Sequence, residues 1–167
     1  YTMTSETQIP WHEVLPWVRR LHDMIQQAIL DSRAAGEGEA WADVIEETEA
    51  DTIFQVDKVT ESAILTWMAR NWPEAWPVEL VMEGLEDRGT VTFPGYVGLN
   101  DTRLKLIVDP IDGTRNLMYD KRPAWILSGV AEQQGAATSL ADIELAVMTE
   151  IPTSKQWRAD QVSAVRS

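Results

Sequence analysis

The sequence has 167 residues, 44% of them hydrophobic, and it includes eight tryptophans, so it can bury the core of one domain and is too apolar for a disordered chain. Its net charge of −13 argues against a nucleic-acid backbone or an anionic membrane as the partner, because both need a basic protein surface. It contains no cysteine, which excludes disulfides, thiolate chemistry and zinc sites with cysteine ligands.

The start of the sequence is polar, and we expect residues 1–10 to form a flexible lead-in. These residues lack the basic start and the apolar stretch of a signal peptide. No apolar run in the sequence reaches the length of a membrane span. On these grounds we expect a cytoplasmic protein that has no membrane partner.

A helical pattern begins at Pro16, a residue that suits the first turn of a helix, and Gly36 suits the end of that helix. Between them, apolar side chains recur every three or four residues, as on the buried face of an amphipathic helix. His22 lies within this pattern, and we expect it on the helix surface rather than in a metal site. The apolar positions are Trp17, Val18, Leu21, Met24, Ile25, Ala28 and Ile29.

Residues 37–51 are strongly acidic, which is typical of a solvated helix face or a loop. A second helix is predicted over 56–72, because apolar side chains again recur with a helical period and Pro73 disfavours helix at the residue before it. The residues predicted to face inward from this helix are Val59, Ala63, Ile64, Trp67 and Met68.

Short apolar runs separated by turn residues follow the second helix and predict strands. The runs are 79–82, 104–108, 125–131 and 143–149. Residues 84–100 are rich in glycine and proline and predict turns, and residues 154–167 favour no single element. Two helices followed by several strands indicate a layered α+β domain in which helices pack against a sheet.

The most informative segment is Val108–Asn116, in which an apolar strand leads into a turn that contains Asp109 and Asp112. Carboxylates at the end of a rigid strand can hold a hard cation such as magnesium, which needs oxygen ligands in a fixed octahedral arrangement. The backbone carbonyl of Ile111 could add a neutral ligand. If a helix begins at Gly113, its amide groups would point at an anion such as phosphate.

The same residues fit a second interpretation, a plain loop in which the two aspartates accept hydrogen bonds from backbone amides. On spacing alone the two interpretations are equally good, because aspartate is common in turns. An EF-hand is excluded, since its loop needs acidic ligands at alternate positions and a closing glutamate.

The segment Asp109-Pro110-Ile111-Asp112-Gly113-Thr114, with Asn116 two residues later, resembles the signature of the inositol monophosphatase family, D-P-I-D-G-T-x-N. The resemblance implies a layered α+β fold, the α/β/α sandwich of the inositol monophosphatase and fructose-1,6-bisphosphatase type. This chain would supply its N-terminal half, two helices followed by a mainly antiparallel sheet. The resemblance also implies hydrolysis of a phosphate monoester with bound Mg²⁺, for which Mn²⁺ can substitute.

Two further parts of the sequence resemble family elements that precede the signature. Asp51 matches an aspartate that stands shortly before a helix with an acidic beginning, here Asp57 and Glu61. Glu83 matches a glutamate at the end of a short apolar strand, and Glu86 is the alternative for the same position.

The resemblance implies a metal-binding role for four residues. Glu83, Asp109 and the carbonyl of Ile111 would bind one Mg²⁺. Asp109 and Asp112 would bind a second Mg²⁺, together with an aspartate that this sequence does not contain.

The resemblance also implies how the reaction proceeds. Thr114, hydrogen-bonded to Asp51, would orient an attacking water and help to deprotonate it, with Glu83 as a further catalytic residue. The backbone amides of Gly113 and Thr114 would bind the phosphate.

The sequence departs from the family in several places. Leu117 stands where a phenylalanine is usual, and no lysine occurs between Arg33 and Lys58, where many members carry one. The last metal-binding aspartate of the family lies in a W-D-x-A-A element, which is absent from this sequence. We therefore expect residues 11–167 to form an N-terminal metal-binding domain that is truncated before the C-terminal half, and to be weakly active or inactive alone.

The resemblance implies a small phosphorylated metabolite as the substrate, and Asn116 resembles the inositol and sugar phosphate branch of the family. It also implies a homodimer for the full-length protein and no nucleic-acid or membrane partner. The alternative function is that of a non-catalytic acidic family member that binds cations or a protein. Magnesium-dependent release of phosphate would discriminate between the two.

Overall fold

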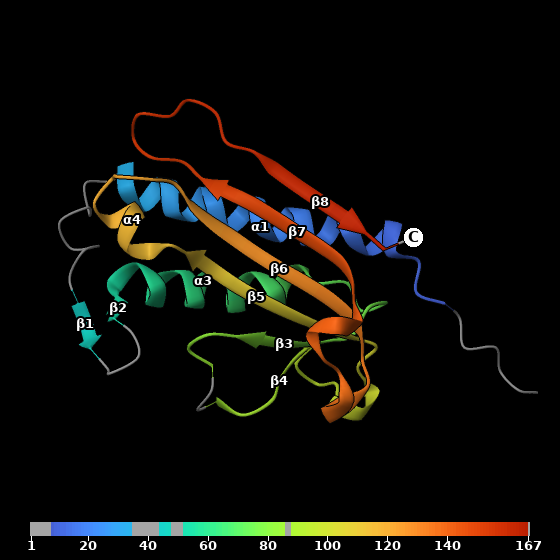
Figure 1. Cartoon of the computed structure of the whole chain (residues 1–167). Helices are drawn as coiled ribbons and strands as arrows, with labels where there is room; N and C mark the ends of the chain where they lie inside the picture. Colours follow the sequence, from blue (N-terminus) through green and yellow to red (C-terminus); the bar gives the residue numbers. More distant parts are fainter. Residues whose placement is uncertain (1–7, 35–43, 48–51, 86–87, 167) are drawn as a thin grey trace, which may run out of the picture.

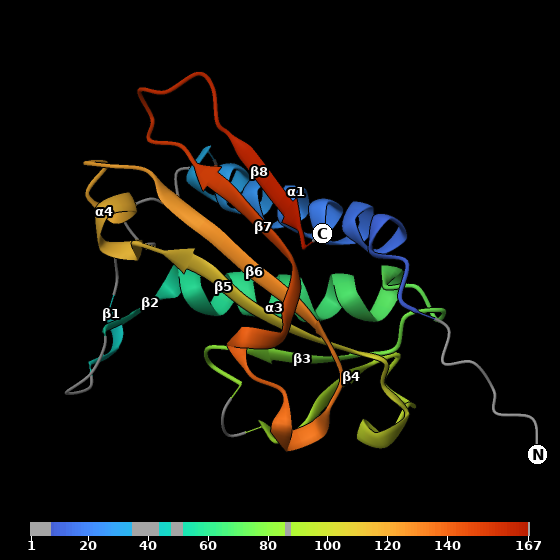
Figure 2. The same cartoon turned by 45° about the vertical axis from the view of Figure 1, so that its right-hand side comes forward.

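The computed structural model describes residues 8–34, 44–47, 52–85 and 88–166. Two long helices lie against one face of a six-stranded sheet (Figure 1). In a view turned by 45° both helices are still on the same side of the sheet (Figure 2). The expected layered α+β architecture is thus confirmed, because each helix buries its apolar stripe against the apolar face of the sheet.

The elements follow the chain order that the sequence pattern predicts, with two helices before most of the strands. They are α1 (Trp11–Ala34), β1 (Val44–Glu47), β2 (Thr52–Phe54), α3 (Gln55–Asn71), β3 (Val78–Met82), β4 (Val91–Phe93), β5 (Leu104–Asp112), α4 (Thr114–Met118), β6 (Ala124–Glu132), β7 (Ile143–Ile151) and β8 (Gln161–Val165).

The strand order of the main sheet is β4-β3-β5-β6-β7-β8. Strands β3 and β5 run parallel to each other, and the other neighbouring pairs of this sheet are antiparallel. The prediction of a mainly antiparallel sheet is therefore confirmed. Strands β1 and β2 form a separate two-stranded sheet.

Helix α1 begins earlier than the sequence predicts, at Trp11 rather than at Pro16. Pro16 lies inside the helix with its side chain exposed. The turn before it is stabilised by Val14, which is completely buried in the core. Ile9, at the end of the predicted lead-in, is buried as well, whereas residues 1–7 of that lead-in lie outside the described part of the chain.

His22 is buried, and the expectation that it lies on the surface of α1 is wrong. Its Nε2 atom is 2.7 Å from Ser128 Oγ on β6, and its Nδ1 atom is 2.9 Å from Thr149 Oγ1 on β7. Both hydroxyl groups lie on the side of the sheet that faces α1. His22 therefore forms a polar link in the middle of an otherwise apolar helix–sheet interface, and its ring nitrogens have the partners that burial requires.

Helix α3 matches the predicted second helix to within one residue at each end. Its buried stripe runs through Val56, Thr60, Ile64 and Met68, which follow one another at intervals of one helical turn. Val59 lies outside that stripe and is 45% exposed, so its predicted inward orientation is wrong.

All four predicted strands are present, and each continues slightly further than predicted. Three strands were not expected: β4, in the turn-rich region, and β1 and β2, around the acidic stretch. Strand β8 accounts for part of the segment that favoured no element. In the described part of the chain, no helix is both long and apolar enough to cross a membrane.

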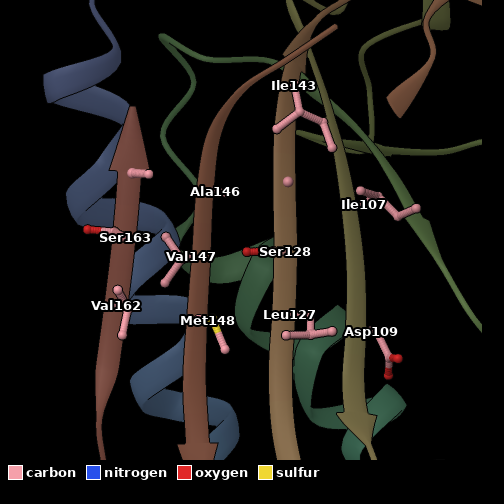
Figure 3. A pocket seen from close by; sticks show the side chains of 12 residues that line it. Ile107, Asp109, Leu127, Ser128, Ile143, Ala146, Val147, Met148, Val162 and Ser163 are labelled. Carbon is pink, nitrogen blue, oxygen red and sulfur yellow. The ribbon is translucent and has the colours of Figure 1, made fainter. Parts of the chain in front are cut away.

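Helices α1 and α3 cover one face of the sheet. We call the opposite face, seen in Figure 3, the open face. Four large apolar side chains on it, from four strands, are between 37% and 54% exposed. They are Val81, Ile107, Met148 and Val162.

Candidate active site

Glu83 and Asp109 come together because β3 and β5 are parallel. Met82, the last residue of β3, is the register partner of Val108 on β5. Glu83 and Asp109 are the next residues of the two segments and therefore follow from neighbouring positions of the sheet, whose strands lie about 4.8 Å apart. Both residues line the same surface pocket. Two of the residues that the sequence predicts as metal ligands are thus found at one pocket, and their role as ligands stays a prediction.

These two carboxylates belong to a row that crosses the open face. From Asp109 the row continues through its register partner Leu127, then Met148, then Val162. Figure 3 shows Asp109 at the margin of the apolar groove lined by these side chains. The carboxylate pair therefore lies where polar and apolar surfaces meet.

Asp112 is placed by an irregularity of β5. Asp109 pairs with Leu127 and Asp112 with Trp125, so three steps on β5 correspond to two steps on β6. Pro110 cannot donate a ladder hydrogen bond, and proline within a sheet is found at such bulges. Because Leu127 and Trp125 lie on one face of β6, the bulge brings Asp109 and Asp112 to the same face.

One oxygen of Asp109 already has a backbone partner, because Ile111 N–H donates a hydrogen bond of 3.1 Å to Asp109 Oδ1. This is the bond expected from the plain-loop interpretation. A carboxylate has two oxygens and about four acceptor positions, so this bond orients Asp109 and does not by itself exclude a cation. The two interpretations of the segment are therefore compatible.

A short helix, α4, begins at Thr114, and Gly113 is the residue directly before it, one position from the start that the sequence predicts. The φ of 91° at Gly113 lies in the left-handed region that favours glycine. A Cβ atom here would also lie 3.8 Å from Ala124 on β6. That distance is ordinary van der Waals contact, so the positive φ is the reason for glycine at this position.

The hydroxyl group of Thr114 lies between a carbonyl and a carboxylate. It donates a hydrogen bond of 2.9 Å to the carbonyl oxygen of Ile111, and its Oγ1 atom is 3.5 Å from Asp57 Oδ1. The carbonyl predicted as a metal ligand thus has a hydrogen-bond partner, although a carbonyl oxygen can accept twice.

Asp57 is a residue to which the sequence interpretation gave no catalytic role. It lies in the first turn of α3, which packs against β5. Asp51, the predicted partner of Thr114, lies outside the described residues, so that pairing stays a prediction. A usable signal was present in the sequence, because Asp57 and Glu61 are four residues apart and share one face of the helix.

In the part of the chain that the structure describes, no three histidine, aspartate or glutamate side chains form a group that could hold a metal ion. Glu83 and Asp109 face one pocket, but Asp112 does not line it. Glu86, the alternative to Glu83, lies outside the described residues.

The residues that do meet fit a magnesium ion. Mg²⁺ is usually held by one or two carboxylates, with water and substrate phosphate oxygens completing its shell. Glu83 and Asp109 supply two carboxylates at the mouth of an open pocket, where water and a phosphate can enter.

No family model and no curated protein matches this chain. Solved structures do match it. The extragenic suppressor protein suhB of Bartonella henselae has a TM-score of 0.62 at 21% identity, and the match covers 92% of this chain and 49% of that one. The fructose-1,6-bisphosphatase of Leishmania major has a TM-score of 0.60 at 13% identity, covering 96% and 49%. An inositol monophosphatase from Zymomonas mobilis has a TM-score of 0.53 at 16% identity, covering 95% and 49%.

At these identities the comparisons establish the fold, and the chain spans about half the length of the structures that it matches. The bulged strand with its two aspartates, and the glycine that precedes α4, are the segment whose sequence resembles the inositol monophosphatase signature. The chain therefore has the fold of the inositol monophosphatases and fructose-1,6-bisphosphatases, over about half of their length.

Proposed function

We propose that this chain carries part of the active site of a magnesium-dependent phosphatase that hydrolyses a small phosphate monoester, such as an inositol phosphate or a sugar phosphate. One observation carries the proposal: β3 and β5 run parallel with Met82 opposite Val108, and the residues that follow these two, Glu83 and Asp109, line one pocket. The names of the matched structures, which include an inositol monophosphatase and a fructose-1,6-bisphosphatase, support the same chemistry.

Glu83 and Asp109 would hold the magnesium ion, and Asp112 would contribute to a second one. When bound, the metal lowers the pKa of a coordinated water and neutralises charge on the phosphate. The bond from Ile111 N–H fixes one oxygen of Asp109. This carboxylate is therefore oriented before any ligand arrives, which reduces the ordering that binding requires.

Asp57 and Thr114 would handle the proton of the attacking water. The Thr114 hydroxyl has one hydrogen, which must turn from the Ile111 carbonyl to Asp57 for this role. The hydroxyl then presents a lone pair that can accept a hydrogen bond from the water. As the water attacks phosphorus, the bond between phosphorus and the ester oxygen breaks and the alcohol leaves. The proton of the water passes to Thr114 Oγ1 while the threonine proton moves to Asp57. The 3.5 Å separation must shorten for this transfer, as catalytic hydrogen bonds often do when substrate binds.

The backbone amides of Gly113 and Thr114 would bind the phosphoryl oxygens. Amides in the first turn of a helix have no acceptor within the helix, and α4 begins at Thr114. Phosphoryl transfer depends mainly on such positioning and charge neutralisation, so these amides need only be held in place. Gly113 contributes to this because it adopts the positive φ that the turn before α4 requires.

The test is phosphate release from inositol monophosphate and fructose bisphosphate, with and without Mg²⁺. It uses the 167-residue chain and any longer polypeptide that contains it. We expect release that requires Mg²⁺ and falls at least about 100-fold in Asp57→Asn, the usual scale of a proton-transfer residue. Release that is absent in every polypeptide, while Mn²⁺ still binds, would favour the non-catalytic alternative.

A further inference from the structure

Helix α3 directs two acidic side chains at two different turns of the candidate site. Asp57 approaches Thr114, in the turn that follows β5. Glu61 lies four residues further along α3, on the same side of the helix, and meets the turn that follows β3. A Cβ atom on Gly84 in that turn would be only 3.1 Å from Glu61 Oε2.

Glu61 is a buried carboxylate with two cationic neighbours. Its side chain is 9% exposed, with Oε1 3.0 Å from Arg88 Nη2 and Oε2 3.5 Å from Lys58 Nζ. Removing one partner of a buried ion pair leaves an uncompensated charge and is strongly destabilising. Glu61 therefore constrains the position of Arg88 more firmly than an exposed carboxylate would.

Arg88 is connected to the end of β3 through two backbone hydrogen bonds. Leu85 N–H donates to the carbonyl of Met82, and Arg88 N–H donates to the carbonyl of Leu85. Leu85 is buried in the core, and Gly84 has a φ of 86°. Glu83 itself is exposed and stands between these anchored residues.

We propose that Glu61 is a positioning residue for Glu83. Its ion pair with Arg88 and its closeness to Gly84 hold the turn after β3 in the conformation in which Glu83 and Asp109 line one pocket. The inference rests on the proposed function for the identity of the bound cation, but the effect of Glu61 on the turn can be measured without any metal. Asp57 and Glu61, on one face of α3, would thus hold the turn after β5 and the turn after β3, respectively.

A matched control distinguishes this role from that of an ordinary ion pair. Glu79 and Lys105 form a second, partly buried pair at 3.2 Å, with side chains 13% and 23% exposed. Glu79 lies in β3, the strand that Glu83 follows. Among the described residues, Glu79 forms no hydrogen bond or ion pair with Gly84 or Arg88. Glu79→Gln thus removes a comparable charge from the same strand and spares the turn.

The experiment measures amide hydrogen exchange of the metal-free protein and its Mn²⁺ affinity by electron paramagnetic resonance. In Glu61→Gln and in Arg88→Met we expect the Leu85 amide to exchange at least about tenfold faster. We expect Mn²⁺ binding to weaken by about 10–100-fold, the usual effect of removing a residue that orients a ligand. Glu79→Gln should change neither quantity, and Arg88→Lys should recover part of both.

Unchanged exchange at Leu85 in both variants would overturn the inference, as would equal acceleration in Glu79→Gln. Arg88 is 59% exposed, so Arg88→Met provides the answer if Glu61→Gln does not fold. If the wild-type protein binds no Mn²⁺, the proposed function fails, and the exchange result alone decides whether Glu61 holds the turn.

Discussion

His22 should make the stability of the protein depend on pH. Burial lowers the pKa of this histidine from 6.5 to about 4, because the charged imidazolium would lose its hydration inside the core. The two neighbouring hydroxyl groups can accept hydrogen bonds from the charged ring, so the cost is that of desolvation rather than of lost hydrogen bonds. The neutral ring is the form that the folded protein favours.

The sign and size of the effect follow from the two pKa values. Between pH 6.5 and pH 4 the unfolded chain binds a proton at His22 that the folded chain excludes, so the free energy of unfolding decreases as the pH falls. Above pH 6.5 the stabilising effect is complete. With these pKa values the loss is about 2 kcal/mol at pH 5 and about 3 kcal/mol at pH 4.

The assay is urea unfolding at pH 7.5, 6, 5 and 4, for the wild-type protein and for His22→Gln. Glutamine keeps an amide that can bond to Ser128 and Thr149 but does not titrate. The carboxylates titrate in both proteins, so the difference between the two curves isolates His22. We expect the variant to be less stable than the wild type at pH 7.5, and the difference to shrink by about 2 kcal/mol at pH 5. A difference that is constant with pH would refute the reasoning.

Other predictions concern the turns of the site. Gly84 and Gly89 both have positive φ, but a Cβ atom on Gly84 would press on Glu61 and one on Gly89 would meet nothing within 4 Å. Gly84→Ala should therefore destabilise the protein by about 1 kcal/mol or more beyond Gly89→Ala in urea unfolding, and equal losses would contradict the close approach. Asp57→Asn should lower kcat at least about 100-fold with little change in KM. Asp51→Asn should have the smaller effect, and the reverse order would favour Asp51, the partner that the sequence predicts for Thr114. The 167-residue chain alone should turn over at least about 100-fold more slowly than a longer polypeptide that supplies the missing aspartate, and equal turnover would show that the residues described above suffice.

Much of the fold could be predicted because the spacing of apolar residues along the sequence indicates which side chains are buried. The stripe of α3 and the apolar runs of the four predicted strands repeat with the spacing of their elements. The start of α1 could not be predicted in this way, because Pro16 resembles the first residue of a helix but lies inside α1. The turn before Pro16 is helical because Val14 packs into the core, which the local sequence does not show. Strand β4 is only three residues long, and it forms because β3 offers it a partner, which no local pattern reveals.

The site was predictable where it is local and unpredictable where it depends on tertiary contacts. Asp109, Asp112 and Gly113 lie in one short segment whose composition indicates a cation or phosphate site. The contact of Thr114 with Asp57 joins residues 57 positions apart, and only the packing of α3 on β5 brings them together. The burial of His22 similarly depends on two hydroxyl groups more than 100 residues away. The homodimer and the identity of the substrate stay predictions.

The most direct test of the central claim is the binding of Mn²⁺, as a spectroscopic substitute for Mg²⁺, to the wild-type protein and to Asp109→Asn and Glu79→Gln. Asp109 is the residue that joins the parallel strand pair to the bulged turn, so its neutral variant should bind Mn²⁺ at least about tenfold more weakly, a difference of about 1.4 kcal/mol. Glu79→Gln, on the same sheet and also facing the pocket, should bind as the wild type does. Equal affinity in the wild type and in Asp109→Asn would contradict the account, because the carboxylate pair would then not be the metal site.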